Sequence, residues 1–217
     1  MLMFARAVLV SLIWASALPA QELFSWHWFE ANEHLTKKYD LRMTFRLRTR
    51  HEFQFVDQIL GGPTLQYRAQ NRVLYFAGYW TQPGHEDKAP WVMGHRTFAG
   101  AERRWDLHRT TLVGRFTWER HFGGGRDDHN RFRFFNRVLF GRKAVAPFLQ
   151  YEWIGMRVGF FSSRQTGGVR FRLHPQVTVD ASYLYDVRRA SWGGPRSALI
   201  TTVSFQRGER EARVTKP

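Results

Sequence analysis

Side chains of two kinds alternate through residues 41–55, and this pattern constrains the fold more than any other part of the chain. The odd positions are mainly apolar and the even positions are mainly arginine: Leu41, Met43, Phe45, Leu47, Thr49, His51, Phe53 and Phe55 against Arg42, Thr44, Arg46, Arg48, Arg50, Glu52 and Gln54. A period of two puts successive side chains on opposite faces of a β-strand, whereas a helix would scatter the arginines around its circumference. The segment therefore predicts a strand with one apolar and one cationic face.

Shorter stretches repeat this alternation, and no segment has a convincing helical period. Counted from Leu41, ten strands are expected, in or near 41–55, 63–69, 72–82, 92–103, 112–119, 131–134, 149–153, 169–173, 177–186 and 196–206. An all-β chain of this kind predicts a single antiparallel up-and-down β-barrel of about ten strands. Phe24–Asn32 is a further element, which forms an extra strand, a plug or half of a pair, so twelve strands are the alternative.

Short and long connections alternate between these strands. The short ones lie near 70–71, 104–106, 142–144 and 174–175, and the long ones at 56–62, 83–91, 123–130, 155–163 and 189–195. Transmembrane barrels have tight periplasmic turns and larger outer loops. Ten strands would then place both ends of a barrel over residues 39–206 on the periplasmic side, after an N-terminal segment at 21–38 and before a charged tail at 207–217.

Residues 1–20 are organised as a cleaved signal peptide. Arg6 supplies a positive start, residues 7–15 form an apolar stretch too short to span a bilayer, and small residues allow cleavage after Ala17 or Ala20. We therefore expect export. The chain has no cysteine, which excludes a lipid-bearing N-terminal cysteine, disulfides and thiolate chemistry.

Alternation alone does not say which face of the barrel points inward, and three features favour a transmembrane barrel over a soluble one. The polar face is concentrated arginine with interspersed acids, aromatic residues gather near strand ends, and the run Leu199–Phe205 resembles the terminal assembly signal of outer-membrane barrels. We expect a monomer in the bacterial outer membrane, in contact with lipid and lipopolysaccharide and inserted by the barrel-assembly machinery. A periplasmic barrel is the alternative.

Seven short motifs carry a resemblance to a known family. They are FAGYW (76–80), HRTFAG (95–100), GRFTWERHF (114–122), RFRFFNRVLF (131–140), QYEWI (150–154), SSRQTGGVRFRL (162–173) and DASYLYD (180–186). In this order and spacing the chain resembles an uncharacterised bacterial family, catalogued as domain of unknown function 2490. The resemblance implies an exported outer-membrane barrel and brings no catalytic residues with it. The chain departs from the family pattern at Ser162-Ser163, where Asp and Asn are usual, and at Gly94, where the family has a glutamate.

Charged residues on the polar faces form the candidate site, which we call the lumen charge network. Its members are Arg42, Arg46, Arg48, Arg50, Glu52, Arg115, Glu119, Arg133, Arg137, Glu152, Arg170, Arg172, Asp180 and Asp186. One interpretation is a lumen that attracts anions, because clustered guanidinium groups between low-dielectric walls focus positive potential. The other, which we favour, is a structural network that plugs a narrow lumen. Turn register places Arg170 opposite Asp180, and Glu152 diagonal to Arg133 and Arg137.

Two loops hold residues from which a rim active site could be built. They are His85, Glu86 and Asp87 in one loop and Asp127, Asp128 and His129 in the other. Neither spacing requires catalysis, since Asp and His are ordinary loop residues. We expect no enzyme, and an outer-membrane hydrolase is the second alternative. No cofactor is expected, and no spacing supports a metal site at His85, His95, His121 or His129.

The net charge of +15 raises the question of nucleic-acid binding. Export argues against that partner. Cations in the loops and at the rim either contact lipid phosphates or form a solvated basic rim with no specific ligand: Arg126, Arg188, Arg189 and Arg196. We therefore expect an outer-membrane barrel with a structural or binding role and a charge-filled lumen. A small anion-selective pore is the first alternative.

Overall fold

The computed structural model describes residues 23–50, 55–84, 90–124, 128–141, 144–157, 159–188 and 194–207. Every regular element in these ranges is a β-strand, and within them no helix is long and apolar enough to cross a membrane. The signal peptide expected at 1–20 and residues 208–217 of the expected tail lie outside the described residues. The described chain is all-β, as the alternation predicts.

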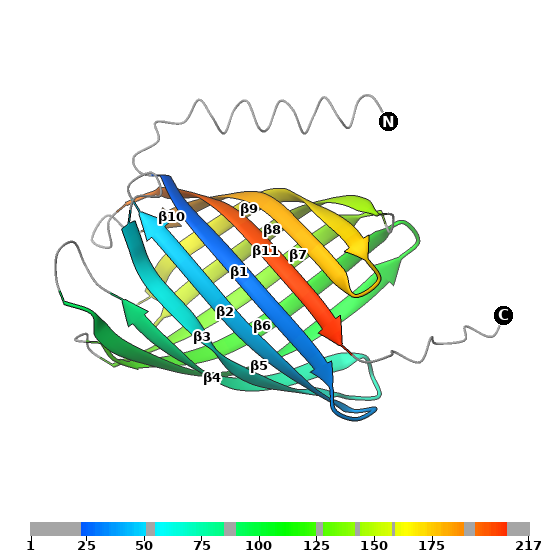
Figure 1. Ribbon diagram of the computed structural model, residues 1–217, viewed down its shortest axis with the longest axis horizontal. Helices are drawn as coiled ribbons and strands as arrows, with labels where there is room; N and C mark the ends of the chain where they lie inside the picture. The colour runs from blue at the N-terminus through cyan, green and yellow to red at the C-terminus, as the bar shows by residue number, and fades with distance from the viewer. Residues whose placement is uncertain are drawn as a thin grey trace.

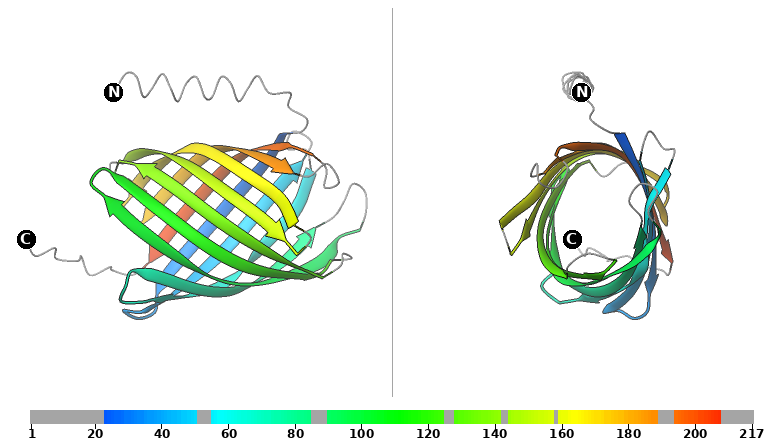
Figure 2. Two further views of the ribbon diagram at one scale, coloured as in Figure 1. Left: turned by 180° about the vertical axis from the view of Figure 1, so that it is seen from behind. Right: turned by 90° about the vertical axis from the view of Figure 1, so that its left-hand side faces the viewer.

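Eleven strands form one closed barrel (Figure 1). They are β1 (Leu23–His34), β2 (Tyr39–Arg50), β3 (Phe55–Arg68), β4 (Val73–Gly84), β5 (Val92–Leu107), β6 (Thr110–Gly123), β7 (His129–Phe140), β8 (Val145–Met156), β9 (Gly159–His174), β10 (Val177–Arg188) and β11 (Arg196–Arg207). Strands adjacent in sequence are paired antiparallel, and β1 closes the ring between β11 and β2. A view along the barrel shows the complete ring (Figure 2).

The seam between β1 and β11 is the parallel pair of the barrel (Figure 1). Its register runs from Leu23 opposite Ser197 to Glu33 opposite Arg207. An odd number of strands requires such a pair, because strand direction alternates along an up-and-down sheet. Leu23–His34, within the segment expected at 21–38, is therefore a wall strand and not a plug. The barrel begins at Leu23 and not at residue 39, and the expectation that both of its ends share one rim is wrong.

Two of the expected long loops are strand instead. Residues 56–62 lie in β3, residues 155–156 end β8, and residues 159–163 begin β9. Register shifts explain both errors, because the β2–β3 and β8–β9 ladders each contain an irregularity that interrupts the period of two. The turn expected at 104–106 lies instead at 108–109, since β5 continues to Leu107.

The two faces of the wall differ in chemistry. Along β2, Arg46 points into the interior and is 9% exposed, whereas its neighbour Phe45 is 46% exposed on the outside. Large apolar side chains cover the outer face: Phe29, Met43, Leu65, Tyr75, Phe116, Phe134, Leu149, Phe171 and Leu199 are among those exposed. On the described strands, outward-facing Asp, Glu, Lys and Arg side chains lie toward strand ends: Glu33, Arg103, Arg120 and Arg207. Charged side chains are therefore concentrated inside the barrel, and apolar side chains cover its outer face.

Apolar side chains pack inside the barrel on the side of the long loops. One buried cluster joins β1, β10 and β11 through Phe24, Trp26, Leu184, Ala198 and Ile200. A second joins β3, β4 and β5 through Leu60, Trp80 and Phe98. Gly62 makes room for the second cluster, because a Cβ there would lie 2.1 Å from the carbonyl oxygen of Tyr79 and 3.1 Å from the Trp80 ring. These clusters hold two tryptophans against the polar interior.

Candidate functional site

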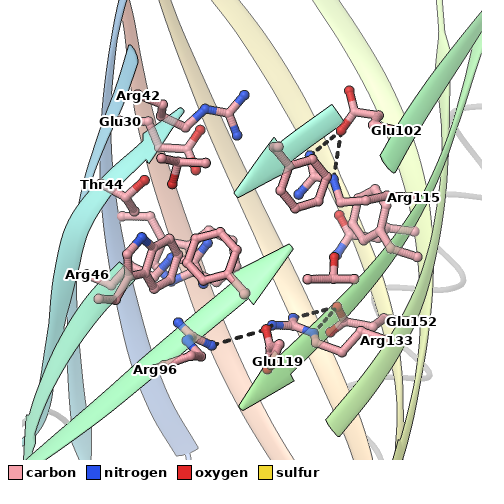
Figure 3. A pocket seen from close by; sticks show the side chains of 18 of the residues that line it. Glu30, Arg42, Thr44, Arg46, Arg96, Glu102, Arg115, Glu119, Arg133 and Glu152 are labelled. Atoms are coloured by element: carbon pink, nitrogen blue, oxygen red, sulfur yellow. Dashed lines mark hydrogen bonds and ion pairs between the residues drawn. The ribbon is translucent and has the colours of Figure 1, made fainter. Parts of the chain in front are cut away.

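Seven charged side chains form one continuous chain of ion pairs across the inner wall, from β5 to β10. In order they are Arg96, Glu119, Arg133, Glu152, Arg164, Asp186 and Arg188. Successive N···O distances are 3.3, 2.8, 2.9, 3.3, 3.2 and 2.7 Å. Each carboxylate is shared by two arginines, which meets the requirement that buried charges be paired. Figure 3 shows the first four members meeting at one end of the cavity.

A second group of ion pairs lies nearer the short turns. The Asp180 carboxylate accepts hydrogen bonds from Arg170 Nε at 2.7 Å and from Arg137 Nη2 at 2.7 Å. Arg170 is directly opposite Asp180 in the ladder, as the turn register predicts. Arg115 donates to Glu102 at 2.7 Å. Asp180 thus joins β7, β9 and β10 through a single buried carboxylate.

Aromatic rings, rather than carboxylates, face the arginines in the middle of β2. In the β1–β2 ladder, Trp28 lies opposite Arg46 and Trp26 lies opposite Arg48. The guanidinium carbons are 3.9 and 4.4 Å from the respective ring centroids. Trp80 of β4 adds a further contact to Arg46 at 4.4 Å. These are cation–π contacts, in which the negative face of the ring attracts the cation.

Part of this network of ion pairs and cation–π contacts lines a cavity of about 90 Å³ (Figure 3). The charged residues that line it are Arg42, Arg46, Arg96, Arg115, Arg133, Arg164, Glu30, Glu102, Glu119 and Glu152. Pockets for drug-sized ligands occupy about 300–1,000 Å³. The cavity therefore has room for a few water molecules or a small ion.

Most of the predicted lumen charge network faces inward. Its inward-facing members are Arg42, Arg46, Arg48, Arg50, Arg115, Glu119, Arg133, Arg137, Glu152, Arg170, Asp180 and Asp186. Arg42 donates to Asn32 at 2.9 Å and Arg50 pairs with Asp57 at 2.9 Å. Arg172 is exposed toward the end of β9, and Glu52 lies outside the described residues.

One expected brace has different partners. Glu152 is diagonal to both Arg133 and Arg137 in the β7–β8 ladder, as predicted. Only Arg133 binds it from β7, and Arg164 of β9 binds its other oxygen at 3.3 Å. Arg137 reaches instead to Asp180. Across a curved wall, the long arginine side chain can reach a partner three strands away.

Several members of the site were not predicted from the sequence. The alternation is weak on the strands or strand ends that carry Arg96, Glu102 and Arg164. The sequence also predicted no role for the tryptophans that contact the arginines. A signal for the tryptophans does exist: β1 carries aromatic residues at alternate positions 24, 26 and 28, which matches the arginine spacing at 46, 48 and 50. The ends of three strands also meet at the short-turn rim, where Asp40 binds His34 and accepts from Arg68 Nε at 2.7 Å.

The described members of the possible rim active site take part in other contacts. Asp128 pairs with Arg120 at 3.2 Å, and the His129 ring stacks on His121 with centroids 4.9 Å apart. Four other candidates, and two of the basic loop residues, lie outside the described residues: His85, Glu86, Asp87, Asp127, Arg126 and Arg189. Within the described ranges, no three His, Asp or Glu side chains are grouped to hold a metal ion.

Two cations expected at the rim face the interior. Arg188 pairs with Asp186 at 2.7 Å, and its side chain is only 14% exposed. Arg196 lies over the ring of Phe24 at 5.1 Å. Both side chains therefore pack inside the barrel.

Residues 24–193 match the family described as "Protein of unknown function (DUF2490)". The chain belongs to this family. The match begins in β1 and ends between β10 and β11. The matched range therefore contains every residue of the ion-pair chain and both tryptophans of β1. No match was found to a curated protein or to a solved structure. The family membership of this DUF2490 barrel brings no assigned activity.

Proposed function

We propose that this protein is an outer-membrane β-barrel whose interior is closed by its own charges, with a structural or binding role in that membrane. The distribution of side chains carries the proposal. Leu149 is 60% exposed on the outside, whereas Arg96 and Arg164 are 3% and 6% exposed inside. A water-soluble barrel has the opposite arrangement. Lipid around the barrel makes the apolar outer face favourable. Closure of the sheet pairs the backbone N–H and C=O groups of neighbouring strands, so no strand edge is left open to lipid.

The dimensions and rims of the barrel support the same proposal. Its strands have 12 to 16 residues, and a transmembrane strand needs about 9–11. A row of tyrosines crosses β2–β4 beside the short turns, with Tyr39 and Tyr67 at 5.3 Å and Tyr67 and Tyr75 at 6.5 Å. Rows of this kind occupy the interfacial girdles of membrane barrels. Arg103 lies over Trp105 near the same rim, where a cation can meet lipid phosphates.

The interior contacts support a closed lumen. Ion pairs that join Arg96, Glu119, Arg133 and Glu152 line the same cavity as Arg46 and its two tryptophan partners (Figure 3). Side chains fill barrels of about eight strands, whereas about sixteen strands leave an aqueous channel. A barrel of eleven strands with arginine, tryptophan and phenylalanine pointing inward is closer to the filled kind.

A small anion-selective pore is a second candidate, because arginine outnumbers glutamate around the cavity. Six arginines and four glutamates line it. Such an excess attracts anions and repels cations from a narrow passage.

Two measurements on the full-length protein test these proposals. An outer-membrane barrel should be recovered with outer membranes and, after detergent extraction, migrate faster on a gel unheated than heated. In planar bilayers the closed barrel should give no steady conductance, and a steady anion-selective conductance would establish the pore instead. Recovery as a freely soluble periplasmic protein would overturn both the closed outer-membrane barrel and the pore.

A further inference from the structure

The cavity inside the barrel carries more positive than negative charge. Its lining has six arginines and four glutamates, an excess of two positive charges. Three of the four carboxylates are already bound to arginines: Glu102, Glu119 and Glu152. The fourth, Glu30, lies opposite Thr44 in the β1–β2 ladder. Even with Glu30 counted, the lining is left cationic.

Arg46 is the least compensated of these cations. Its side chain is largely buried, its Nε has no hydrogen-bond partner, and no carboxylate of the described residues forms an ion pair with it. Trp28 reaches it from one side of β2 and Trp80 from the other. Contact with a ring uses the face of the guanidinium and leaves the N–H donors in its plane unused. Within the described part of the chain, the Nε–H of Arg46 therefore still lacks an acceptor.

Arg96 converges on the same indole. Its guanidinium carbon lies 4.3 Å from the Trp80 ring, and its Nη1 reaches Glu119 at 3.3 Å. Its Nε and Nη2 have no hydrogen-bond partner, and the same holds for the indole nitrogens of Trp28 and Trp80 and for the hydroxyl of Thr44. All of these residues line the cavity. Every one of these groups can donate a hydrogen bond, so together they match a ligand made of acceptors.

Two guanidinium groups against one indole repel each other in a poorly hydrated space, and a shared counter-ion removes that repulsion. We propose that the cavity binds a small divalent oxyanion of the phosphate or sulfate type, held by Arg46 and Arg96 beside Trp80. Charge-assisted hydrogen bonds from arginine to such oxygens are short and strong, and the guanidinium fork suits two of them at once.

The size of the cavity selects the free anion. A space of about 90 Å³ is well below the roughly 300–1,000 Å³ of pockets for drug-sized ligands, so it suits a tetrahedral oxyanion with a few water molecules better than a larger phosphate ester. The phosphate of a lipid headgroup has the same chemistry, yet its glycerol and acyl chains would have to enter the barrel. The site depends on the interior geometry alone, so it stands or falls separately from the membrane location.

Titration of inorganic phosphate into the detergent-folded full-length protein tests the site. We expect one phosphate to bind per barrel by calorimetry and to raise the unfolding temperature above that in chloride of equal ionic strength. Sulfate should compete. Glycerol phosphate should bind at least tenfold more weakly because of its size. Binding of glycerol phosphate as tight as that of phosphate would assign the site to a headgroup, and equal effects of phosphate and chloride would leave a general salt effect. Either result overturns the proposal.

Variants locate the site. Arg46→Gln removes the cation and should weaken phosphate binding at least tenfold, while raising the unfolding temperature in anion-free buffer because a buried uncompensated charge is gone. Arg46→Lys keeps the charge without the planar fork and should bind with intermediate affinity; it also serves if the first variant does not fold. Arg103→Gln is the matched control, since it removes an arginine that contacts a tryptophan on the outer face. An unchanged phosphate response in both Arg46 variants would contradict the assignment.

Discussion

At the residue scale, the interior uses two different ways to hold buried arginines. On β5–β10 carboxylates hold them, as in the chain from Arg96 to Arg188. On β2, Arg46 and Arg48 are held mainly by indole rings. A cation–π contact contributes about 0.5–2 kcal/mol and does not neutralise the charge. Among the described residues, Arg46 and Arg48 have no carboxylate partner, whereas each arginine of the chain on β5–β10 is paired with at least one carboxylate.

Asp180 offers the sharpest test of the ion pairs, because this one carboxylate binds two arginines. Asp180→Asn keeps the shape of the side chain but leaves Arg170 and Arg137 without a counter-charge. We expect the free energy of unfolding to fall by about 3–5 kcal/mol, the usual cost of breaking a buried pair. Chemical unfolding of the barrel in detergent or lipid measures this change.

The control for that variant is Asp128→Asn. Asp128 pairs with Arg120, and both side chains are about half exposed, at 52% and 53%. Exposed pairs contribute about 0–1 kcal/mol, so this change should be nearly neutral. Equal decreases in the free energy of unfolding of the two variants would show that burial of Asp180 inside the barrel does not strengthen its ion pairs.

At the element scale, strand β1 decides how the barrel closes. The existence of the ten strands from β2 to β11 could be predicted from the sequence, because apolar outward-facing residues alternate along them with polar inward-facing residues. The role of β1 could not, because its inward positions 24, 26 and 28 are aromatic and its outward positions 25 and 27 are Ser and His, which reverses the usual pattern. Its partners lie at both ends of the chain, and local alternation carries no information on such distant pairing. For the same reason, the sequence predicted the arginines of the candidate site but not their aromatic partners, which belong to β1 and β4.

Introduced cysteines test the seam, since the chain has none of its own. Phe29 and Val203 are directly opposite in the β1–β11 ladder. A chain with Phe29→Cys and Val203→Cys should be joined efficiently by a short thiol-specific cross-linker, and the product should be visible as a shifted band on a denaturing gel.

The matched pair is Phe45→Cys with Val203→Cys. In a ten-stranded barrel, β2 would lie beside β11 and this second pair would cross-link. In the eleven-stranded barrel, β1 separates the two strands. Cross-linking of the second pair in preference to the first would contradict the closure by β1.

At the scale of the whole molecule, the proposed location follows from the contrast between the two faces of one wall. Leucine, phenylalanine and tyrosine cover the outside, while the charges are gathered inside or toward the rims. Neither face is unusual on its own. Their arrangement around a closed ring is what makes lipid the proposed outer solvent.

Arginine scanning on the outer face tests this arrangement. Ala99 is exposed near the middle of β5, and Leu107 is exposed at its end. In a bilayer, Ala99→Arg should cost about 2–4 kcal/mol, and Leu107→Arg should cost about 0–1 kcal/mol because it lies near the interface. Unfolding titrations in lipid vesicles measure both values. Two small and equal costs would favour a barrel surrounded by water.

The parallel seam separates the two ends of the barrel wall. Leu23 and Arg207 stand at opposite mouths, because β1 and β11 run side by side in one direction. A strand of 12 residues is roughly 40 Å long. A circular permutant, which an even-stranded barrel could form with a short joining peptide, would here need a linker as long as the wall itself. If the short turns face the periplasm, as the loop lengths predict, a fusion partner attached before Leu23 would be displayed on the cell surface, and one attached after Arg207 would stay in the periplasm.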